Sequence, residues 1–279
     1  MKDYITDQNF YIAHNTDYEN RIYNPHSHDE IEIYIHISGG KHFFVDGVTY
    51  DIKKRDVIIF GSNQIHQILK NPNEIYERYT IVYKKEFLMS LGADYIEINN
   101  LISDIVKLKG NVLNLSEGSF DILLNMLESY KTNKNIANNL YKLSKFLEII
   151  IFILEKYEKN EVMEDRYVNN PLVGDIIKKI DLFYTDCDFT VARLAEMVHI
   201  SKCYMCDVFK KNTGITILNY LNHKRIIAAK AMLTEGVSIV SCADSLGFGS
   251  YNDFIRVFKK VTGDTPKRYF MQNIGRERL

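Results

Sequence analysis

Between Ile31 and Tyr83 the apolar residues fall into short runs in which apolar and polar positions alternate. The runs are IEIYIHI, HFFVDGVTYDI, DVIIF and ERYTIVY, broken by SGG, DG and NPN. Short runs of period two with Gly and Asn turns between them are typical of antiparallel strands. The N-terminal part of the chain is therefore predicted to be an antiparallel β-barrel or sandwich.

From Glu86 onward the apolar spacing becomes helical. In one segment it alternates between four and three residues, as in a heptad seam, at Ile136, Leu140, Leu143, Leu147, Ile150, Leu154 and Tyr157. We predict one long helix here, and a homodimer in which the first six of these residues meet a second copy of the chain. The alternative is a core helix of a monomer.

The segment EKNEVMEDRYVNNP ends the helical stretch, and Pro171 marks a new start. We predict a barrel over residues 1–90, a helical dimerisation segment and linker over 91–168, and an all-α domain over 169–279. The fold class is α+β. Residues 1–168 hold 19 Lys and Arg against 25 Asp and Glu, whereas residues 169–279 hold 16 against 11. A basic C-terminal third is consistent with binding to DNA.

The composition, 46% hydrophobic and 25% charged, is that of a soluble globular protein. The N-terminus lacks the basic-then-apolar order of a signal peptide, and the apolar run Ile149–Leu154 is too short to cross a bilayer. We expect a cytoplasmic protein. All four cysteines lie in the last third of the chain and are expected to be reduced.

Residues 201–220 and 250–269 share a pattern at an offset of 49 residues. The identical residues are Ser201, Phe209, Lys210, Lys211, Thr213, Gly214, Thr216 and Tyr220, matched by Ser250, Phe258, Lys259, Lys260, Thr262, Gly263, Thr265 and Tyr269. A duplicated unit explains them. Each copy predicts a helix, a tight turn and a second helix capped by serine. Between the copies we predict one helix over 216–233, about 27 Å long, which would place the capped helices about one duplex turn apart.

Residues 172–270 resemble the DNA-binding domain of the AraC/XylS family of bacterial transcription regulators. The resemblance is carried by SKCYMCDVFKKNTG, RIIAAKAML, SIVSCADSLG and FGSYNDFIRVFKKVTGDTPKRY. It implies promoter binding through both units and activation of RNA polymerase. The implied base contacts are Cys203, Cys206, Asp207, Tyr251, Asn252 and Arg256. The candidate phosphate contacts are Lys202, Lys210, Lys211, Arg225, Lys259 and Lys260.

The two reading helices differ in their chemistry. Arg256 can bond guanine twice and Asn252 can bond adenine twice, whereas two thiols and a carboxylate make a poor reader. We expect weak or shape-based recognition by the first unit, with Asp207 accepting from a cytosine amino group. Cys203 and Cys206 form a C-x-x-C four residues after His199, but no second pair completes a zinc site, so structural thiols are favoured.

Six of the eight histidines fall within the first 66 residues. Their order resembles the metal-binding pattern of cupin barrels, a domain that many AraC-like regulators carry at this position. The resemblance implies His26, His28, Glu32 and His66 as ligands of a divalent transition metal. The chain departs from the pattern at Arg55, where glycine is common, and no proline precedes His66. No cofactor is expected to be required.

Glu32, Tyr34 and His36 alternate with isoleucines along one predicted strand, in the same parity as His26 and His28. We expect this polar face to line an effector pocket formed by His26, His28, Glu32, Tyr34, His36 and His66. The alternative turns the polar face to solvent and leaves the isoleucines as core.

The leading prediction is a transcription regulator, more often an activator in this family, controlled by a small molecule such as a sugar and without enzymatic activity. No phosphate-binding glycine loop or nucleophile elbow is present in the sequence. The alternatives are a metal-dependent cupin enzyme and a ligand-independent DNA-binding protein.

Overall fold

The computed structural model describes residues 9–18, 23–71, 73–92, 94–107, 112–132, 138–159 and 170–273. Its N-terminal half is built on a five-stranded sheet in the order β1-β7-β2-β5-β8 and a three-stranded sheet in the order β4-β3-β6. Neighbouring strands are antiparallel. The strands are β1 (Phe10–Asp17), β2 (Ile31–Ser38), β3 (His42–Val45), β4 (Val48–Asp51), β5 (Asp56–Phe60), β6 (His66–Leu69), β7 (Tyr76–Tyr83) and β8 (Val112–Asn114). The predicted antiparallel barrel is confirmed, with β1 and β8 added by the structure.

The two faces of β2 serve different cores, because successive side chains of a strand point to opposite sides. Ile31, Ile33 and Ile35 belong to the core between the large sheet and the helices. Tyr34 belongs to a second core inside the barrel, and His36 next to it is 3% exposed. The inward parity of the polar residues is confirmed, while the isoleucines are core as well, because both faces of this sheet are covered.

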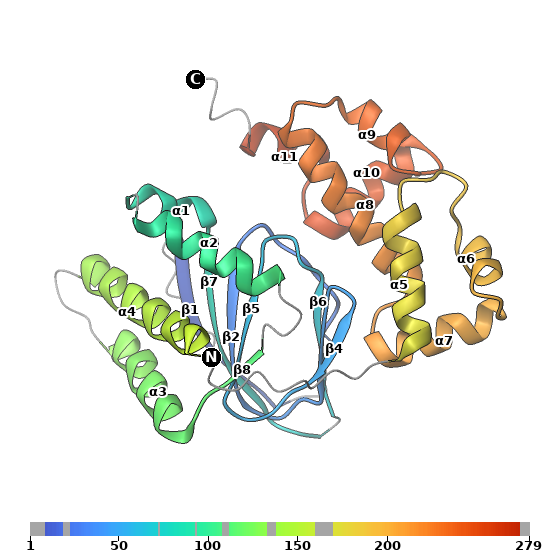
Figure 1. Ribbon diagram of the computed structural model, residues 1–279. Helices are drawn as coiled ribbons and strands as arrows, with labels where there is room; N and C mark the ends of the chain where they lie inside the picture. The colour runs from blue at the N-terminus through green and yellow to red at the C-terminus, as the bar shows by residue number, and fades with distance from the viewer. Residues whose placement is uncertain are drawn as a thin grey trace.

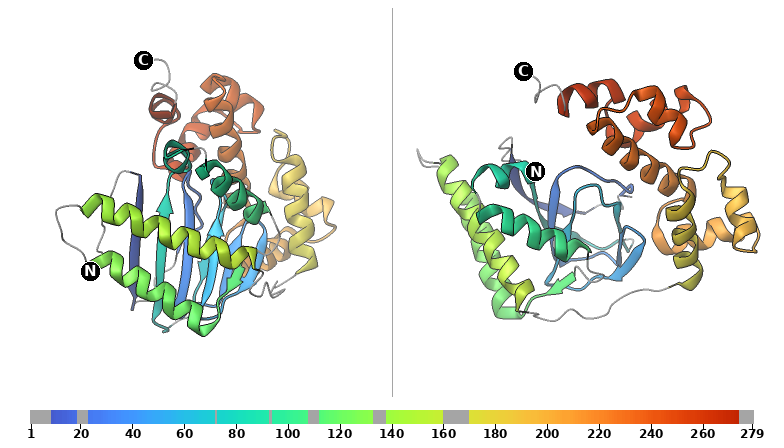
Figure 2. Two further views of the ribbon diagram at one scale, coloured as in Figure 1. Left: turned by 60° about the vertical axis from the view of Figure 1, so that its left-hand side comes forward. Right: turned by 45° about the horizontal axis from the view of Figure 1, so that its top comes forward.

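A helical layer covers the outer face of the large sheet (Figures 1 and 2). It comprises α1 (Lys85–Ser90), α2 (Asp94–Lys107), α3 (Glu117–Thr132) and α4 (Asn138–Glu158). Phe146, Ile149 and Ile153 of α4 are fully buried in the core that these helices form with the sheet. The described helices of the predicted segment 91–168 therefore share one apolar core with the barrel.

The C-terminal part is helical, as predicted, and contains two helix-turn-helix units. Its elements are α5 (Pro171–Phe183), α6 (Val191–Met197), α7 (Lys202–Thr213), α8 (Ile217–Thr234), α9 (Ile239–Ser245), α10 (Tyr251–Thr262) and α11 (Pro266–Asn273). The expected caps are present, since the hydroxyls of Ser201 and Ser250 accept hydrogen bonds from the amides of Tyr204 and Asp253. In the part of the chain that the structure describes, no helix is long and apolar enough to span a membrane.

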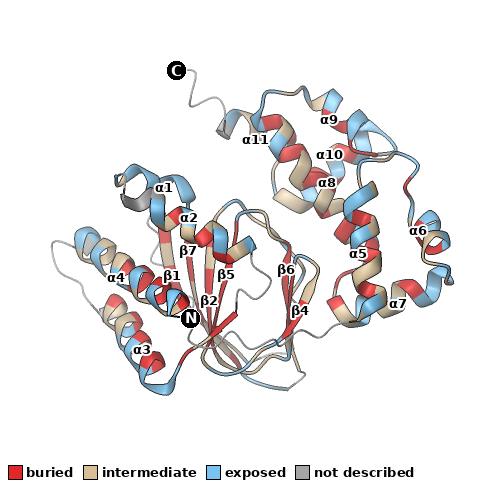
Figure 3. Cartoon of the chain, viewed as in Figure 1, coloured by how far each residue is buried: buried red, intermediate tan, exposed pale blue. Residues whose placement is uncertain are grey.

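Each unit has its own apolar core, and α8 contributes to both (Figure 3). Tyr220 and Leu221 at the start of α8 lie in the core of the first unit. Ile226, Ala229 and Leu233 lie in the core of the second. The helix therefore connects the two units through their apolar cores.

Arg225 of α8 joins the two units and corrects one expectation from the sequence. It is only 6% exposed, and its guanidinium donates to the carbonyl oxygens of Tyr184 (2.6 Å) and Asp186 (3.2 Å), at the end of α5 and in the following loop. The guanidinium also lies 5.7 Å from the ring centroid of Phe248, in the turn of the second unit. Because these contacts bury it, Arg225 has a structural role here and not the predicted place at a phosphate.

The turn of the second unit packs against this arginine through a glycine. Gly247 has a φ of +68°, and a Cβ atom there would lie 2.6 Å from Nη2 of Arg225 and 2.7 Å from the oxygen of Asp186. Both the backbone conformation and the close approach require glycine.

We predict that Gly247→Ala destabilises the protein by about 3 kcal/mol, because it adds a clash to the cost of a left-handed alanine. Gly236→Ala is the matched control, since Gly236 has a φ of +87° with nothing within 4 Å of the added atom, and we expect a loss of about 1 kcal/mol. Urea unfolding followed by circular dichroism measures both. Equal losses in the two variants would show that the contact with Arg225 does not matter.

Candidate functional site

The two predicted reading helices, α7 and α10, expose the side chains that the sequence analysis singled out. Cys203, Asp207, Tyr251, Asn252 and Arg256 are exposed. Cys206 is half-buried, and burial raises the pKa of its thiol. The candidate phosphate contacts other than Arg225 are also exposed, namely Lys202, Lys210, Lys211, Lys259 and Lys260. Both helices therefore present a polar and basic face to solvent, while contact with DNA stays a prediction.

Arg256 has a neighbour that orients it. Its Nη2 donates to Oδ1 of Asp253 over 2.9 Å, one turn earlier on α10, and both side chains are more than half exposed. Such an exposed pair contributes little stability, so the guanidinium can exchange Asp253 for a base edge at small cost.

The turns of the two units differ by one residue. His199 in the first turn has a φ of +57° and Gly247 in the second a φ of +68°, at an offset of 48. The capping serines that follow, Ser201 and Ser250, are 49 apart. The extra residue in the second turn explains why the sequence repeat holds at 49 only from the second helix onward.

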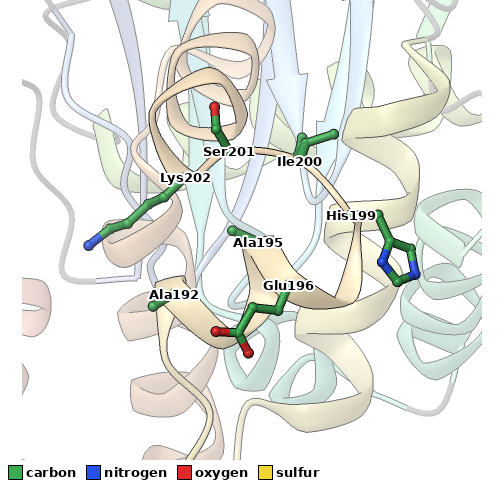
Figure 4. Close-up of a pocket in the computed structure, with 7 residues that line it drawn as sticks. All are labelled: Ala192, Ala195, Glu196, His199, Ile200, Ser201 and Lys202. Carbon is green, nitrogen blue, oxygen red and sulfur yellow. The ribbon is translucent and has the colours of Figure 1, made fainter.

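An open hollow of about 730 Å³ lies beside the first turn (Figure 4). Its lining residues are Ala192, Ala195, Glu196, His199, Ile200, Ser201 and Lys202. It belongs to the first helix-turn-helix unit and not to the barrel, so it is not the effector pocket that the barrel residues predict. Among the described residues, His199, Cys203 and Cys206 do not form a group that could hold a metal ion.

Four predicted residues of the barrel come together at one end of it. His26, His28, Glu32 and His66 each offer a ligand atom within 4.8 Å of the others. We call these four residues the histidine cluster. The backbones of His26 and His66 are paired by two hydrogen bonds of 3.1 and 3.0 Å, so residues 40 positions apart are held in register. Three imidazoles and a carboxylate are a donor set suited to a divalent transition metal.

The electrostatics of the histidine cluster centre on Glu32. Nε2 of His28 lies 2.9 Å from its carboxylate and Nε2 of His66 lies 3.6 Å away. Burial alone would raise the pKa of Glu32, but the hydrogen bond from His28 and the charges of His28 and His66 hold it well below its usual value. Burial likewise opposes charge on His28, yet its bond to Glu32 raises the pKa of the imidazole. The histidine cluster thus contains an ionised carboxylate that can bind a cation.

His66 supplies the observation that tests the fit of a metal. It is 2% exposed, and its Nε2 atom has no hydrogen-bond partner within normal distance among the described residues. A buried nitrogen aimed at a carboxylate and two further imidazoles is satisfied by a bound cation. Arg55, which stands where glycine is common, has a φ of +76°, so the chain keeps the glycine-like turn without the glycine.

Tyr34 and His36 lie deeper, inside the barrel. The hydroxyl of Tyr34 and Nδ1 of His36 are 2.8 Å apart, and burial lowers the pKa of His36 to about 4. Phe43, Phe60 and Tyr76 pack around Tyr34. The six predicted effector residues therefore divide into the histidine cluster and an interior pair that is closely packed in this structure.

The helical C-terminal domain covers the end of the barrel that holds the histidine cluster, through residues that were not predicted from the sequence. Lys230 of α8 pairs with Asp29 (2.5 Å) and donates to Oδ1 of Asn63 (2.6 Å). His223, two turns earlier on α8, is buried, and burial lowers its pKa to about 4, with a smaller contribution from the nearby imidazoles of His26 and His66. His223 and Lys230 lie seven residues apart and so share a helix face, which is the signal in the sequence that could have found them.

The C-terminal part of the heptad seam, on α4, faces inward. Ile136 lies outside the described residues, Leu140 is 70% exposed, and Leu143 and Leu147 pack partly against the core with the sheet. Ile150 and Leu154 are 0% and 4% exposed in that core. The prediction that Ile150 and Leu154 contact a second copy is therefore wrong, because the large sheet of their own domain covers them.

The comparisons with known proteins agree with this division into a barrel and a DNA-binding domain. The sequence model of the AraC-like ligand-binding domain matches residues 11–149, and that of a helix-turn-helix domain matches residues 194–272. The chain thus combines an N-terminal AraC-like ligand-binding domain with a C-terminal helix-turn-helix domain. It belongs to the AraC family.

Two curated relatives match part of the chain. The transcriptional regulatory protein HptR of Staphylococcus aureus (strain NCTC 8325 / PS 47) is 33% identical over 109 residues, which are 39% of this chain and 41% of HptR. The bifunctional transcriptional activator/DNA repair enzyme AdaA of Bacillus subtilis (strain 168) is 36% identical over 111 residues, 39% of this chain and 50% of AdaA. Each match spans no more than half of the relative.

Among solved structures, ToxT of Vibrio cholerae O395 is 14% identical and covers 96% of this chain and 100% of its own, with a TM-score of 0.40. The C-terminal domain of the response regulator yesN of Fusobacterium nucleatum is 40% identical and covers 34% of this chain and 93% of its own, with a TM-score of 0.33.

The inward stripe of α4 leads to a stability prediction. Ile150→Ala should lower the free energy of unfolding by about 2–5 kcal/mol, because it opens a cavity between helix and sheet. Leu140→Ala, on the exposed side of the same helix, should change it by less than about 0.5 kcal/mol. Urea unfolding at two protein concentrations measures both. A loss at Leu140 that shrinks on dilution would instead show that this residue contacts a second copy.

Proposed function

We propose that the protein is a transcription regulator that binds duplex DNA through α7 and α10 and is controlled by a ligand bound in the barrel. The observation that supports it best is the exposure of a polar, basic face on both helices, each backed by its own core and joined by α8. Two such helices in one chain can enter successive major grooves on one side of the duplex.

The two units are expected to contribute differently. On α10, Arg256, Asn252 and Tyr251 supply hydrogen-bonding groups for base edges, and Lys259 and Lys260 lie on the same helix for phosphates. On α7, Cys203, Cys206 and Asp207 offer little for direct reading. The first unit then recognises DNA mainly through phosphates and groove shape, with Asp207 free to accept from cytosine.

We expect Arg256→Ala and Lys259→Ala to differ in kind. Loss of the guanidinium should reduce the preference between cognate and substituted operators by about 1–3 kcal/mol at one or two positions. Loss of the ammonium should weaken binding to all duplexes alike and lower the salt slope by about one. Anisotropy titrations of the full chain with its upstream intergenic DNA and a scrambled duplex, at several salt concentrations, separate the two. Equal and uniform losses would refute these roles.

For the barrel we propose a divalent-cation site in the histidine cluster. His26, His28, Glu32 and His66 would hold the ion, and it would supply a fixed positive charge and open coordination positions to an effector. The buried Nε2 atom of His66, which has no hydrogen-bond partner in the part of the chain that the structure describes, supports the site. An effector that coordinates the ion need not enter the packed interior around Tyr34 and His36.

The cation site predicts that Co²⁺ binds the metal-stripped protein at one equivalent, giving the visible absorption of a histidine-carboxylate complex. Glu32→Gln removes the charged ligand and should reduce the affinity at least tenfold, since even second-shell changes cost metal sites 10–100-fold. His42→Gln is the control, because His42 pairs with Asp51 outside the cluster. Equal affinities for the two variants would place the metal elsewhere.

Three further features of the regulator are proposed on family grounds: activation through RNA polymerase, a homodimer and a cytoplasmic location. If the chain dimerises, the exposed apolar side chains of Leu140 (70%) and Ile151 (46%) on the outer face of α4 offer a contact that the buried seam does not. The enzyme and ligand-independent alternatives gain no support from the described residues.

A further inference from the structure

The barrel holds the two helix-turn-helix units in different ways. Phe44 and Ile65 of the barrel are part of the apolar core of the first unit, with the ring centroids of Phe44 and Tyr220 5.9 Å apart. In the described part of the chain, the core of the second unit contains no barrel residue. The first unit is therefore packed onto the barrel, whereas the second is held by polar contacts.

These polar contacts form what we call the latch, made of Lys230, Asp29, Asn63 and Tyr269. Lys230 Nζ lies 2.5 Å from Oδ1 of Asp29 and 2.6 Å from Oδ1 of Asn63. The hydroxyl of Tyr269 on α11 donates to Oδ2 of Asp29 over 3.2 Å, and its ring centroid lies 5.4 Å from the ammonium. Lys230 is only 7% exposed, so its charge is stable there only while it stays paired.

The latch and the histidine cluster share the same backbone. Asp29 directly follows His28, and the amide of Asn63 donates to the carbonyl oxygen of His28 over 2.7 Å. His223, on the same helix as Lys230, is buried with no hydrogen-bond partner for Nδ1 among the described residues. A change at His28 therefore reaches both barrel residues that bind Lys230.

We propose that a divalent cation in the histidine cluster and the closed latch oppose each other, so that binding of the cation releases the second helix-turn-helix unit from the barrel. This inference rests on the proposed cation site. A dication held by His28 attracts the carboxylate of the next residue, Asp29, and repels the ammonium of Lys230. A buried ammonium that loses its carboxylate is strongly disfavoured, so the contact opens.

Because coupling between two sites is reciprocal, an open latch must favour the cation. Lys230→Met removes the ammonium and leaves Asp29, which is about half exposed, to water. Asn63→Gly removes one acceptor and keeps the left-handed backbone, since Asn63 has a φ of +64°. Lys224→Met is the control, because Lys224 pairs over 2.9 Å with Asp181 of α5 and is not part of the latch.

The experiment is a calorimetric titration of the metal-stripped full-length protein and the three variants with Co²⁺. We expect Lys230→Met to bind Co²⁺ about tenfold more tightly than the wild type, Asn63→Gly to show a smaller gain, and Lys224→Met to show none. If Lys230→Met does not fold, Asn63→Gly carries the test.

Each other outcome is decisive. Equal affinities in all proteins would refute the coupling and leave the cation site standing. Weaker binding by the latch variants would overturn its sign, because the closed latch would then favour the cation. No binding of Co²⁺ by any of the proteins would refute the cation site and this inference with it.

Hydrogen–deuterium exchange of the wild type gives a second readout. Co²⁺ should speed exchange in α11, which carries Tyr269, and leave α5 and α7 of the first unit unchanged. Unchanged exchange in α11 with Co²⁺ bound would show that the second unit is not released.

Discussion

The burial of α8 on three sides is the constraint on which the rest of the molecule depends. Its first turns lie in the core of one helix-turn-helix unit and its last turns in the core of the other. On a third side, Lys230 binds the barrel beside the histidine cluster. A helix with a single apolar stripe can pack against one neighbour only. Because α8 packs against three, it carries apolar or buried polar residues on several sides. The contact of Lys230 with the barrel is therefore made by the same helix that builds the cores of both units.

The sequence predicted the structure correctly where a pattern of apolar residues is compatible with only one arrangement. Alternation along a strand can only separate two faces, so the inward position of Glu32, Tyr34 and His36 could be read from parity. A heptad seam has two meanings, because a core-facing stripe and a contact between copies share the spacing of three and four. Ile150 and Leu154 face the core of their own domain, because the large sheet covers α4. No local signal in the sequence could decide that.

Charged residues were the hardest to place. Arg225 and Lys230 lie on a helix of a DNA-binding domain, where a basic side chain usually meets a phosphate. Both are instead buried, one on carbonyl oxygens of the loop after α5 and one on Asp29 and Asn63 of the barrel. Their partners lie 39 or more residues away in sequence, so burial follows from tertiary contacts that composition and periodicity do not contain.

The contrast between the two attachments also bears on which part of the molecule can move. Separating Phe44 and Ile65 from the core of the first unit would expose apolar surface, at about 25 cal/mol for each Å². Separating Lys230 from Asp29 exchanges one set of polar partners for water, and buried ion pairs are often close to neutral in net stability. The free-energy difference between held and released states is therefore smaller at the second unit. A ligand shifts a population only by its difference in affinity for the two states. A modest difference in affinity is therefore enough to release the second unit, but not the first.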